Sequence, residues 1–143
     1  MKILHILHEL KFSGAEIMYV DAAPVFQKLD CKLSVVNTAP NLGEYSSYFE
    51  KAGYKVFHWP YPKSYIQRWK YYRKVISFLK QEHYDAVHIH SSALKWGISY
   101  CAWQAGCKPV YTFHSIFHSH WYSYLYHRWL RWSAKHLFGC TFQ

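Results

Sequence analysis

Short apolar runs alternate with longer segments of helical character, and this alternation constrains the fold more than any other feature. The runs favour β-strands and span residues 2–7, 33–37, 54–59, 84–90 and 108–114. The helical segments between them span residues 15–29, 45–52, 64–83 and 93–105. Apolar strands that alternate with helices predict a parallel sheet covered on both faces. The predicted fold class is therefore α/β, with a doubly wound, mostly parallel, Rossmann-like sheet.

Two of the predicted helices carry further local signals. Pro24 lies inside the first helix and predicts that this helix is kinked or split. In the segment 64–83, apolar side chains recur at the spacing of one helical face, at Tyr65, Trp69, Tyr72, Ile76 and Leu79. A last helix is predicted at 121–137, followed by the start of a sixth strand at 138–142.

The length of 143 residues predicts one domain, 1–143. No apolar run approaches the roughly 18–20 residues of a membrane span. The first ten residues are too short and too soon charged for a signal peptide. Without an export signal, the four cysteines are interpreted as reduced thiols, which predicts a cytoplasmic location. Because the sixth strand has barely begun at residue 143, we expect the chain to be a truncated part of a larger protein.

Positive charge is concentrated in two segments. Residues 63–83 carry a net charge of +5 and residues 121–138 a net charge of +3, out of +9 for the chain. The second segment interleaves cations with aromatic side chains, at Arg128, Trp129, Arg131, Trp132 and Lys135. This composition predicts a membrane-facing surface that meets anionic lipid, hence a peripheral protein on the inner face of the membrane. A nucleic-acid partner is disfavoured because no RNA-binding module signature is present, and a solvated helix face is the plainer alternative.

The surplus of aromatic side chains also predicts an interface. Phe, Trp and Tyr make up 21% of the chain, more than one small core can bury. An exposed strand edge offers a second route to self-association. A homodimer through the edge or through the aromatic surface is therefore predicted.

In a doubly wound sheet, ligands bind beyond the carboxyl ends of the strands. The first strand is followed by Ser13 and Gly14, where the start of a helix can face an anion. The other predicted rim residues follow the fourth and fifth strands, at His90, Ser91, His114, Ser115 and His118. All of them are predicted to lie on one edge of the sheet.

The histidines of this edge allow a metal-site hypothesis. His90, His114, His118 and His120 could together ligate zinc and serve a metal hydrolase. No acidic or cysteine ligand is nearby in the sequence, and histidines in aromatic-rich loops often serve packing. The interpretation that we adopt is that the protein uses no metal.

Four segments in a fixed order resemble a known family. They are FSGAE at 12–16, YDAVHIHS at 84–91, AWQAGCKPVYTFHS at 102–115 and AKHLFGCTF at 134–142. Together they resemble the N-terminal, acceptor-side domain of the family 4 retaining glycosyltransferases, which have the two-domain GT-B architecture. The resemblance spans essentially the whole chain.

The resemblance implies roles for several residues. Ser13 and Gly14 match the loop whose backbone approaches the donor diphosphate, with Ser13 in place of the family's first glycine. His114 matches a histidine near the reacting sugar, which implies a catalytic role. No cofactor is implied beyond the nucleotide-sugar co-substrate.

The family's C-terminal donor-binding domain, with its paired glutamates, has no counterpart in these residues. The resemblance therefore implies the acceptor-side half of an enzyme that transfers a sugar to a hydroxyl acceptor with retention. The acceptor would be a lipid-linked glycan in the synthesis of cell-surface polysaccharide, and the isolated chain is expected to be inactive. The alternative hypothesis is a non-catalytic module that binds membrane or nucleic acid through its basic aromatic helices.

Overall fold

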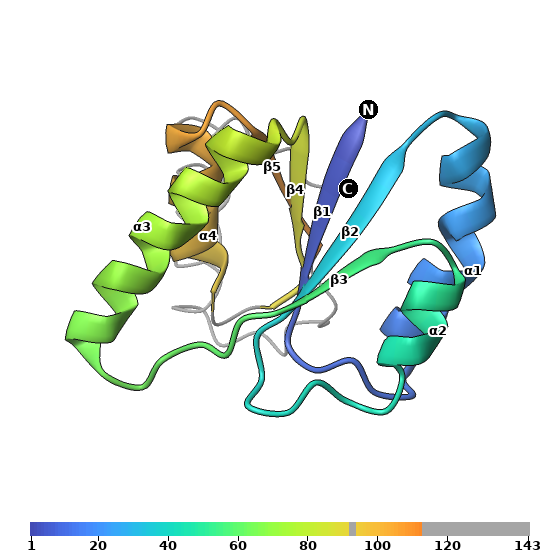
Figure 1. Cartoon of the computed structure of the whole chain (residues 1–143), viewed down its shortest axis with the longest axis horizontal. Helices are drawn as coiled ribbons and strands as arrows, with labels where there is room; N and C mark the ends of the chain where they lie inside the picture. Colours follow the sequence, from blue (N-terminus) through green and yellow to red (C-terminus); the bar gives the residue numbers. More distant parts are fainter. Residues whose placement is uncertain (92–93, 113–143) are drawn as a thin grey trace, which may run out of the picture.

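The computed structural model describes residues 1–91 and 94–112, and within them five strands form one parallel sheet. The strands are β1 (Lys2–Leu7), β2 (Lys32–Asn37), β3 (Lys55–His58), β4 (Ala86–Ile89) and β5 (Lys108–Tyr111). Their order across the sheet is β3-β2-β1-β4-β5 (Figure 1). The predicted doubly wound, Rossmann-like fold is confirmed. The helix and strand predicted at 121–137 and 138–142 lie outside the described residues.

The helices cover both faces of the sheet. They are α1 (Gly14–Lys28), α2 (Ser46–Lys51), α3 (Tyr65–Glu82) and α4 (Lys95–Gln104). The chain steps outward from β1 to β3, then returns and steps outward from β4 to β5 on the other side. Because right-handed crossovers in opposite directions place their helices on opposite faces, α1 and α2 cover one face and α3 and α4 the other (Figure 1).

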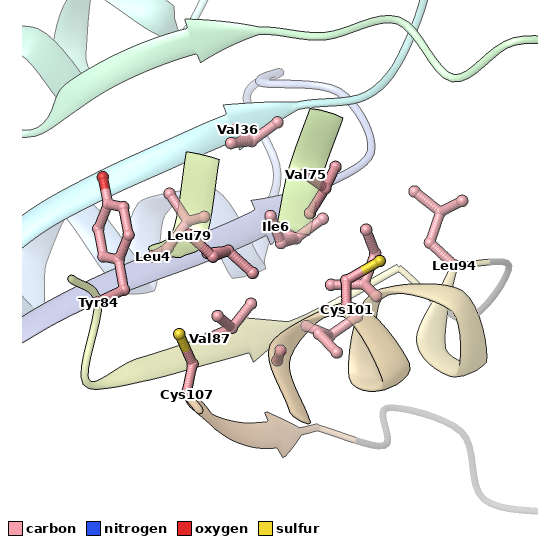
Figure 2. Close-up of a cluster of buried hydrophobic side chains, with 13 residues drawn as sticks. Leu4, Ile6, Val36, Val75, Leu79, Tyr84, Val87, Leu94, Cys101 and Cys107 are labelled. Carbon is pink, nitrogen blue, oxygen red and sulfur yellow. The ribbon is translucent and has the colours of Figure 1, made fainter. Parts of the chain in front are cut away.

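The central strand β1 separates two hydrophobic clusters. Leu4 and Ile6 of β1 point toward α3 and α4, where they meet Val75, Leu79 and Cys101 (Figure 2). The alternate residues of β1 pack toward α1 and α2, because side chains alternate between the faces of a strand. Burying a side chain such as Leu4 completely contributes about 1.5–3 kcal/mol to stability.

Pro24 does not split the first helix, so that alternative of the prediction was wrong. The helix α1 continues through Pro24 to Lys28. The proline removes the one hydrogen bond to the carbonyl group of Val20. Because Pro24 is on the exposed side of the helix, water can reach this part of the backbone.

The apolar stripe of α3 is buried only in its second half. Leu79 is completely buried, whereas Tyr65 is 83% and Trp69 61% exposed. The first turns of α3 extend past the lower edge of the sheet in Figure 1, where no strand of the described sheet lies beneath them. The helical spacing predicted the apolar stripe of α3 correctly. It contains no information on where the sheet ends, and therefore none on which part of the stripe is buried.

Gly97 allows the close packing of α4 against α3. A Cβ atom at this position would collide with the ring of Tyr72, whose hydroxyl group is 2.9 Å from that of Tyr61. We predict that Gly97→Ala lowers the free energy of unfolding by about 1–3 kcal/mol, as overpacking does. Urea unfolding measures this change. Gly14→Ala is the control, because a Cβ there meets nothing within 4 Å; equal stability of the two variants would contradict the close contact.

Candidate functional site

The candidate site lies at the carboxyl ends of β1 and β4. These neighbouring strands send their connections to opposite sides of the sheet, and ligands bind in the crevice at such a switch point. Ser13 and Gly14 follow β1 at the start of α1, and His90 and Ser91 follow β4 directly. The structure therefore brings these four predicted residues to one edge, while His114, Ser115 and His118 lie outside the described residues.

The loop between β1 and α1 is held by the loop that follows β2. The hydroxyl group of Thr38 donates a hydrogen bond of 2.9 Å to the carbonyl oxygen of Leu7. Further along, the N–H group of Tyr45 donates to the carbonyl oxygen of Leu10 over 2.9 Å. Gly43, with φ of +88°, packs so closely on Leu10 that a Cβ atom would collide with its carbonyl group. Two loops thus brace each other where the candidate anion site begins.

The first turn of α1 offers backbone donors to a ligand. Ser13 is the N-cap residue with extended φ and ψ, but its side chain does not cap the helix. Its hydroxyl group donates instead to the carboxylate of the buried Glu16. Gly14 is exposed, and the space that a Cβ would occupy has no atom within 4 Å. Uncapped N–H groups beside open space form a surface that an anion can approach.

Tyr19 connects this helix to β4. Its hydroxyl group lies 3.0 Å from Nδ1 of His90 and 3.3 Å from Nδ1 of His88. His88 in turn lies 2.6 Å from the hydroxyl group of Thr112, the first residue after β5, through its Nε2 atom. One polar network therefore joins the segments that follow β1, β4 and β5.

His5 closes the network from within β1. It pairs in register with His88, and the two Nδ1 atoms are 3.3 Å apart. Burial, reinforced by the nearby His88 and His90, lowers the pKa of His5 to about 3. With its hydrogen on Nδ1, a neutral His5 would donate to Nδ1 of His88, and its Nε2 atom has no hydrogen-bond partner among the described residues.

The proton positions of the other members follow. If Nδ1 of His88 accepts from His5, its Nε2 atom carries the hydrogen and donates to Thr112. Burial raises the pKa of Tyr19, so that its hydroxyl group keeps its proton and is available to donate to His90, the nearer of the two imidazole groups. With this tautomer of His5, hydrogen bonds would run from His5 through His88 to Thr112.

Sequence reasoning did not identify His5 or Tyr19. The signal for His5 was present, since it is a titratable side chain in an otherwise apolar strand. Tyr19 had no signal, because its contact with β4 depends on how α1 crosses the sheet. His88 is half-buried and also belongs to the network.

Several predictions fall outside the described residues and stay predictions. They concern the rim residues His114, Ser115 and His118 and the basic aromatic residues Arg128, Trp129, Arg131, Trp132 and Lys135. Within residues 1–91 and 94–112, no three His, Cys, Asp or Glu side chains form a group that could hold a metal ion. In the same part of the chain, no helix is long and apolar enough to cross a bilayer.

The fold and the site together define a Rossmann-like domain that presents a helix start at its switch point. The sequence matches glycosyltransferase family 4 over residues 12–141, and the chain belongs to this family. A search of curated proteins gave no significant match.

Solved structures of glycosyltransferases share the fold. HepE from Anabaena, solved in complex with UDP and glucose, is 21% identical with a TM-score of 0.61, covering 81% of this chain and 30% of HepE. A glycosyltransferase from Rickettsia africae is 13% identical with a TM-score of 0.65, covering 99% of this chain and 42% of that one. MurG from Acinetobacter baumannii is 12% identical with a TM-score of 0.62, covering 88% and 38%. The chain therefore spans less than half the length of each, and the expected likeness to one half of a GT-B fold is confirmed.

The low pKa of His5 predicts an acid-sensitive fold. In the unfolded chain His5 binds a proton below its ordinary pKa of 6.5, whereas in the fold it binds one only near pH 3. The contribution of neutral His5 to the free energy of unfolding is complete above about pH 6.5. It is lost as the pH falls toward 3, by about 2 kcal/mol between pH 7 and pH 5. Urea unfolding at the two pH values measures this loss.

His5→Asn keeps a hydrogen-bond donor near the Nδ1 position and cannot titrate. Between pH 7 and pH 5, the free energy of unfolding of this variant should therefore fall by about 2 kcal/mol less than that of the unaltered chain. His8→Gln, the same kind of exchange at an exposed histidine, is the comparison variant. If the free energy of unfolding changed with pH to the same extent in His5→Asn and in the unaltered chain, this result would contradict the neutral state of His5.

Proposed function

We propose that the chain is the acceptor-side domain of a retaining glycosyltransferase that moves a sugar from a nucleotide-sugar donor to a hydroxyl acceptor. The observation that carries the proposal is the open start of α1 at the switch point, in a chain that belongs to glycosyltransferase family 4. HepE, which shares the fold, was solved with UDP and with UDP-glucose. A nucleoside diphosphate is therefore the anion that we assign to this helix start.

The proposed chemistry follows from where charge develops. When the bond between the sugar and the diphosphate breaks, negative charge grows on the departing phosphate oxygen. Backbone N–H groups after Ser13, fixed by the braced loops, stabilise that charge more than they stabilise the intact donor. Because the Ser13 hydroxyl group is engaged by Glu16, the backbone supplies this interaction and not the side chain.

The acceptor side is proposed to be the rim beyond β4 and β5. His90 and Ser91 stand at this edge, and Lys95 begins α4 close by. We assign the acceptor hydroxyl group to this rim, with His114 in the catalytic role that the family resemblance implies and with Ser115 and His118 nearby in sequence. Lys95, whose pKa is lowered by burial, places a cation in the same region.

The finer features of the proposal concern the biological setting. We propose a lipid-linked glycan as the acceptor, cell-surface polysaccharide as the product, and a cytoplasmic location at the inner face of the membrane. In a two-domain enzyme the greater part of the donor site lies in the second domain, so the 143 residues alone are proposed to have little transferase activity. Binding rather than turnover is therefore the suitable measurement.

Titration with nucleoside diphosphates tests the proposal on the chain as it is. Uridine, guanosine and adenosine diphosphates are added to isotopically labelled protein, and the backbone amide signals are followed by NMR. We predict that at least one of them shifts the signals of Gly14, Ala15 and Glu16. Gly14→Ala should weaken this binding about tenfold, since its Cβ fills the space in front of the helix start.

The same variant separates binding from folding. Because no atom lies within 4 Å of the added Cβ, Gly14→Ala should unfold at the same urea concentration as the unaltered chain. Val25→Ala, an exposed change on the same helix, should leave both stability and binding unchanged. If none of the diphosphates shifts these signals, or if Gly14→Ala binds as well as the unaltered chain, the proposed donor site is wrong.

A further inference from the structure

The first half of α3 and the outer side of α4 expose an unusual set of apolar side chains. On α3, Tyr65 is 83%, Ile66 74% and Trp69 61% exposed. On α4, Tyr100 is 48% and Trp103 53% exposed. Such large side chains are ordinarily buried, and a group of them on two neighbouring helices indicates an interaction surface. We refer to these five residues and the cations around them as the α3–α4 face.

A groove runs between the two helices on this face. It has a volume of about 520 Å³ and is lined by Trp69, Tyr72, Arg73, Ile76, Trp96 and Tyr100 together with Gly97. The lining is aromatic and aliphatic apart from Arg73, whose guanidinium group lies 4.7 Å from the centre of the Trp69 ring. The groove thus combines apolar walls with one cation held in place by an aromatic side chain.

The charge around the groove is of one sign. Helix α3 carries five cations and one acid, and α4 carries one cation and no acid. The one acid, Glu82, is at the far end of α3 and pairs with Lys2 at 2.6 Å. No Asp or Glu occurs after Asp85, so the rest of the chain cannot supply a side-chain carboxylate to this face.

The opposite side of the sheet carries almost no net charge. Helices α1 and α2 together hold three acids, Glu16, Asp21 and Glu50, and two lysines, Lys28 and Lys51. Among the described helices, the excess of cations is therefore on the α3–α4 side. An anionic surface would attract this face of the domain more strongly than the other.

We propose that the α3–α4 face docks on the surface of an anionic lipid bilayer. Tyr and Trp side chains suit the boundary between headgroups and acyl chains, and Ile66 adds apolar area that a polar surface would not solvate. Lys70 and Arg73, exposed beside them, meet the phosphates of anionic lipids. The groove accommodates part of an acyl chain, with Arg73 within reach of the headgroup.

The position of the face connects it with the candidate site. Helix α3 begins at the same edge of the sheet as α1, the edge at which the strands end (Figure 1). A domain docked through the first turns of α3 would therefore hold its rim close to the membrane surface. This last step rests on the proposed function, because it gives a lipid-linked acceptor a short path to the rim.

Vesicle flotation tests the docking surface. The unaltered chain should bind vesicles of equal parts phosphatidylcholine and phosphatidylglycerol, should not bind vesicles of phosphatidylcholine alone, and should be released by salt. Lys70→Glu with Arg73→Glu should lower the partition coefficient at least about 25-fold, taking about fivefold for each cation. Ile66→Ser with Trp69→Ser should also lower it, without altering the far-ultraviolet circular dichroism.

Matched variants on the opposite side provide the control. Lys28→Glu with Lys51→Glu makes the same charge change on α1 and α2, and Val25→Ser with Leu29→Ser removes exposed apolar area there. Both pairs should bind vesicles as the unaltered chain does. Equal losses in the control pairs, or binding to single-stranded RNA with none to vesicles, would overturn the proposal.

The outcomes of this test and of the diphosphate titration are separable. A chain whose α1 signals shift with a nucleoside diphosphate but which ignores anionic vesicles retains the proposed function and loses the docking surface. A chain that binds vesicles through α3 but no diphosphate has the docking surface without the proposed donor site.

Discussion

Pairing of β1 with strands on both of its sides is the constraint on which the rest of the structure depends. β1 is in register with β2 from Lys2 to Leu7 and with β4 from Ile3 to Ile6. Since the chain leaves β1 toward β2 but reaches β4 from β3, the reversal of direction falls beside β1. This reversal opens the crevice between the carboxyl ends of β1 and β4, and the same pairing sets His5 level with His88. The site is thus a consequence of the sheet order.

A polar network in this position imposes a condition on the core. Three imidazole groups and the Tyr19 hydroxyl group lie close together on the α1 side of the sheet. His5, the fully buried member, is compatible with its surroundings only while it is neutral, because burial and the neighbouring imidazole groups lower its pKa. The hydrogen bonds of the network fix the geometry of the rim more closely than contacts between apolar side chains would. The segments after β1, β4 and β5 are therefore positioned by chemistry as well as by the backbone.

The fold was largely predictable from the sequence, whereas the site was predictable only in outline. Alternating apolar and helical segments determine the sheet, and strand ends determine its rim, so Ser13, Gly14, His90 and Ser91 were placed correctly on one edge. What joins them was not predictable, because Tyr19 reaches His90 through the crossing of α1 over the sheet, a tertiary property. For the same reason periodicity identified the stripe on α3 but not that Tyr65 and Trp69 lie beyond the sheet. Local patterns report which side of a helix is apolar, not what covers it.

The crossover from β3 to β4 explains why an exposed apolar surface and the rim share one edge. This connection changes the face of the sheet and passes from β3 at one edge to β4 beyond β1, and it contains the longest described helix. A helix of 18 residues rises about 27 Å, while a four-residue strand such as β4 covers about 13 Å. The excess length has to project past the sheet, and in this chain it projects at the carboxyl edge (Figure 1). The overhanging helix start is a geometric result of this difference in length. In this chain the overhang carries aromatic and basic side chains, where polar ones would have sufficed.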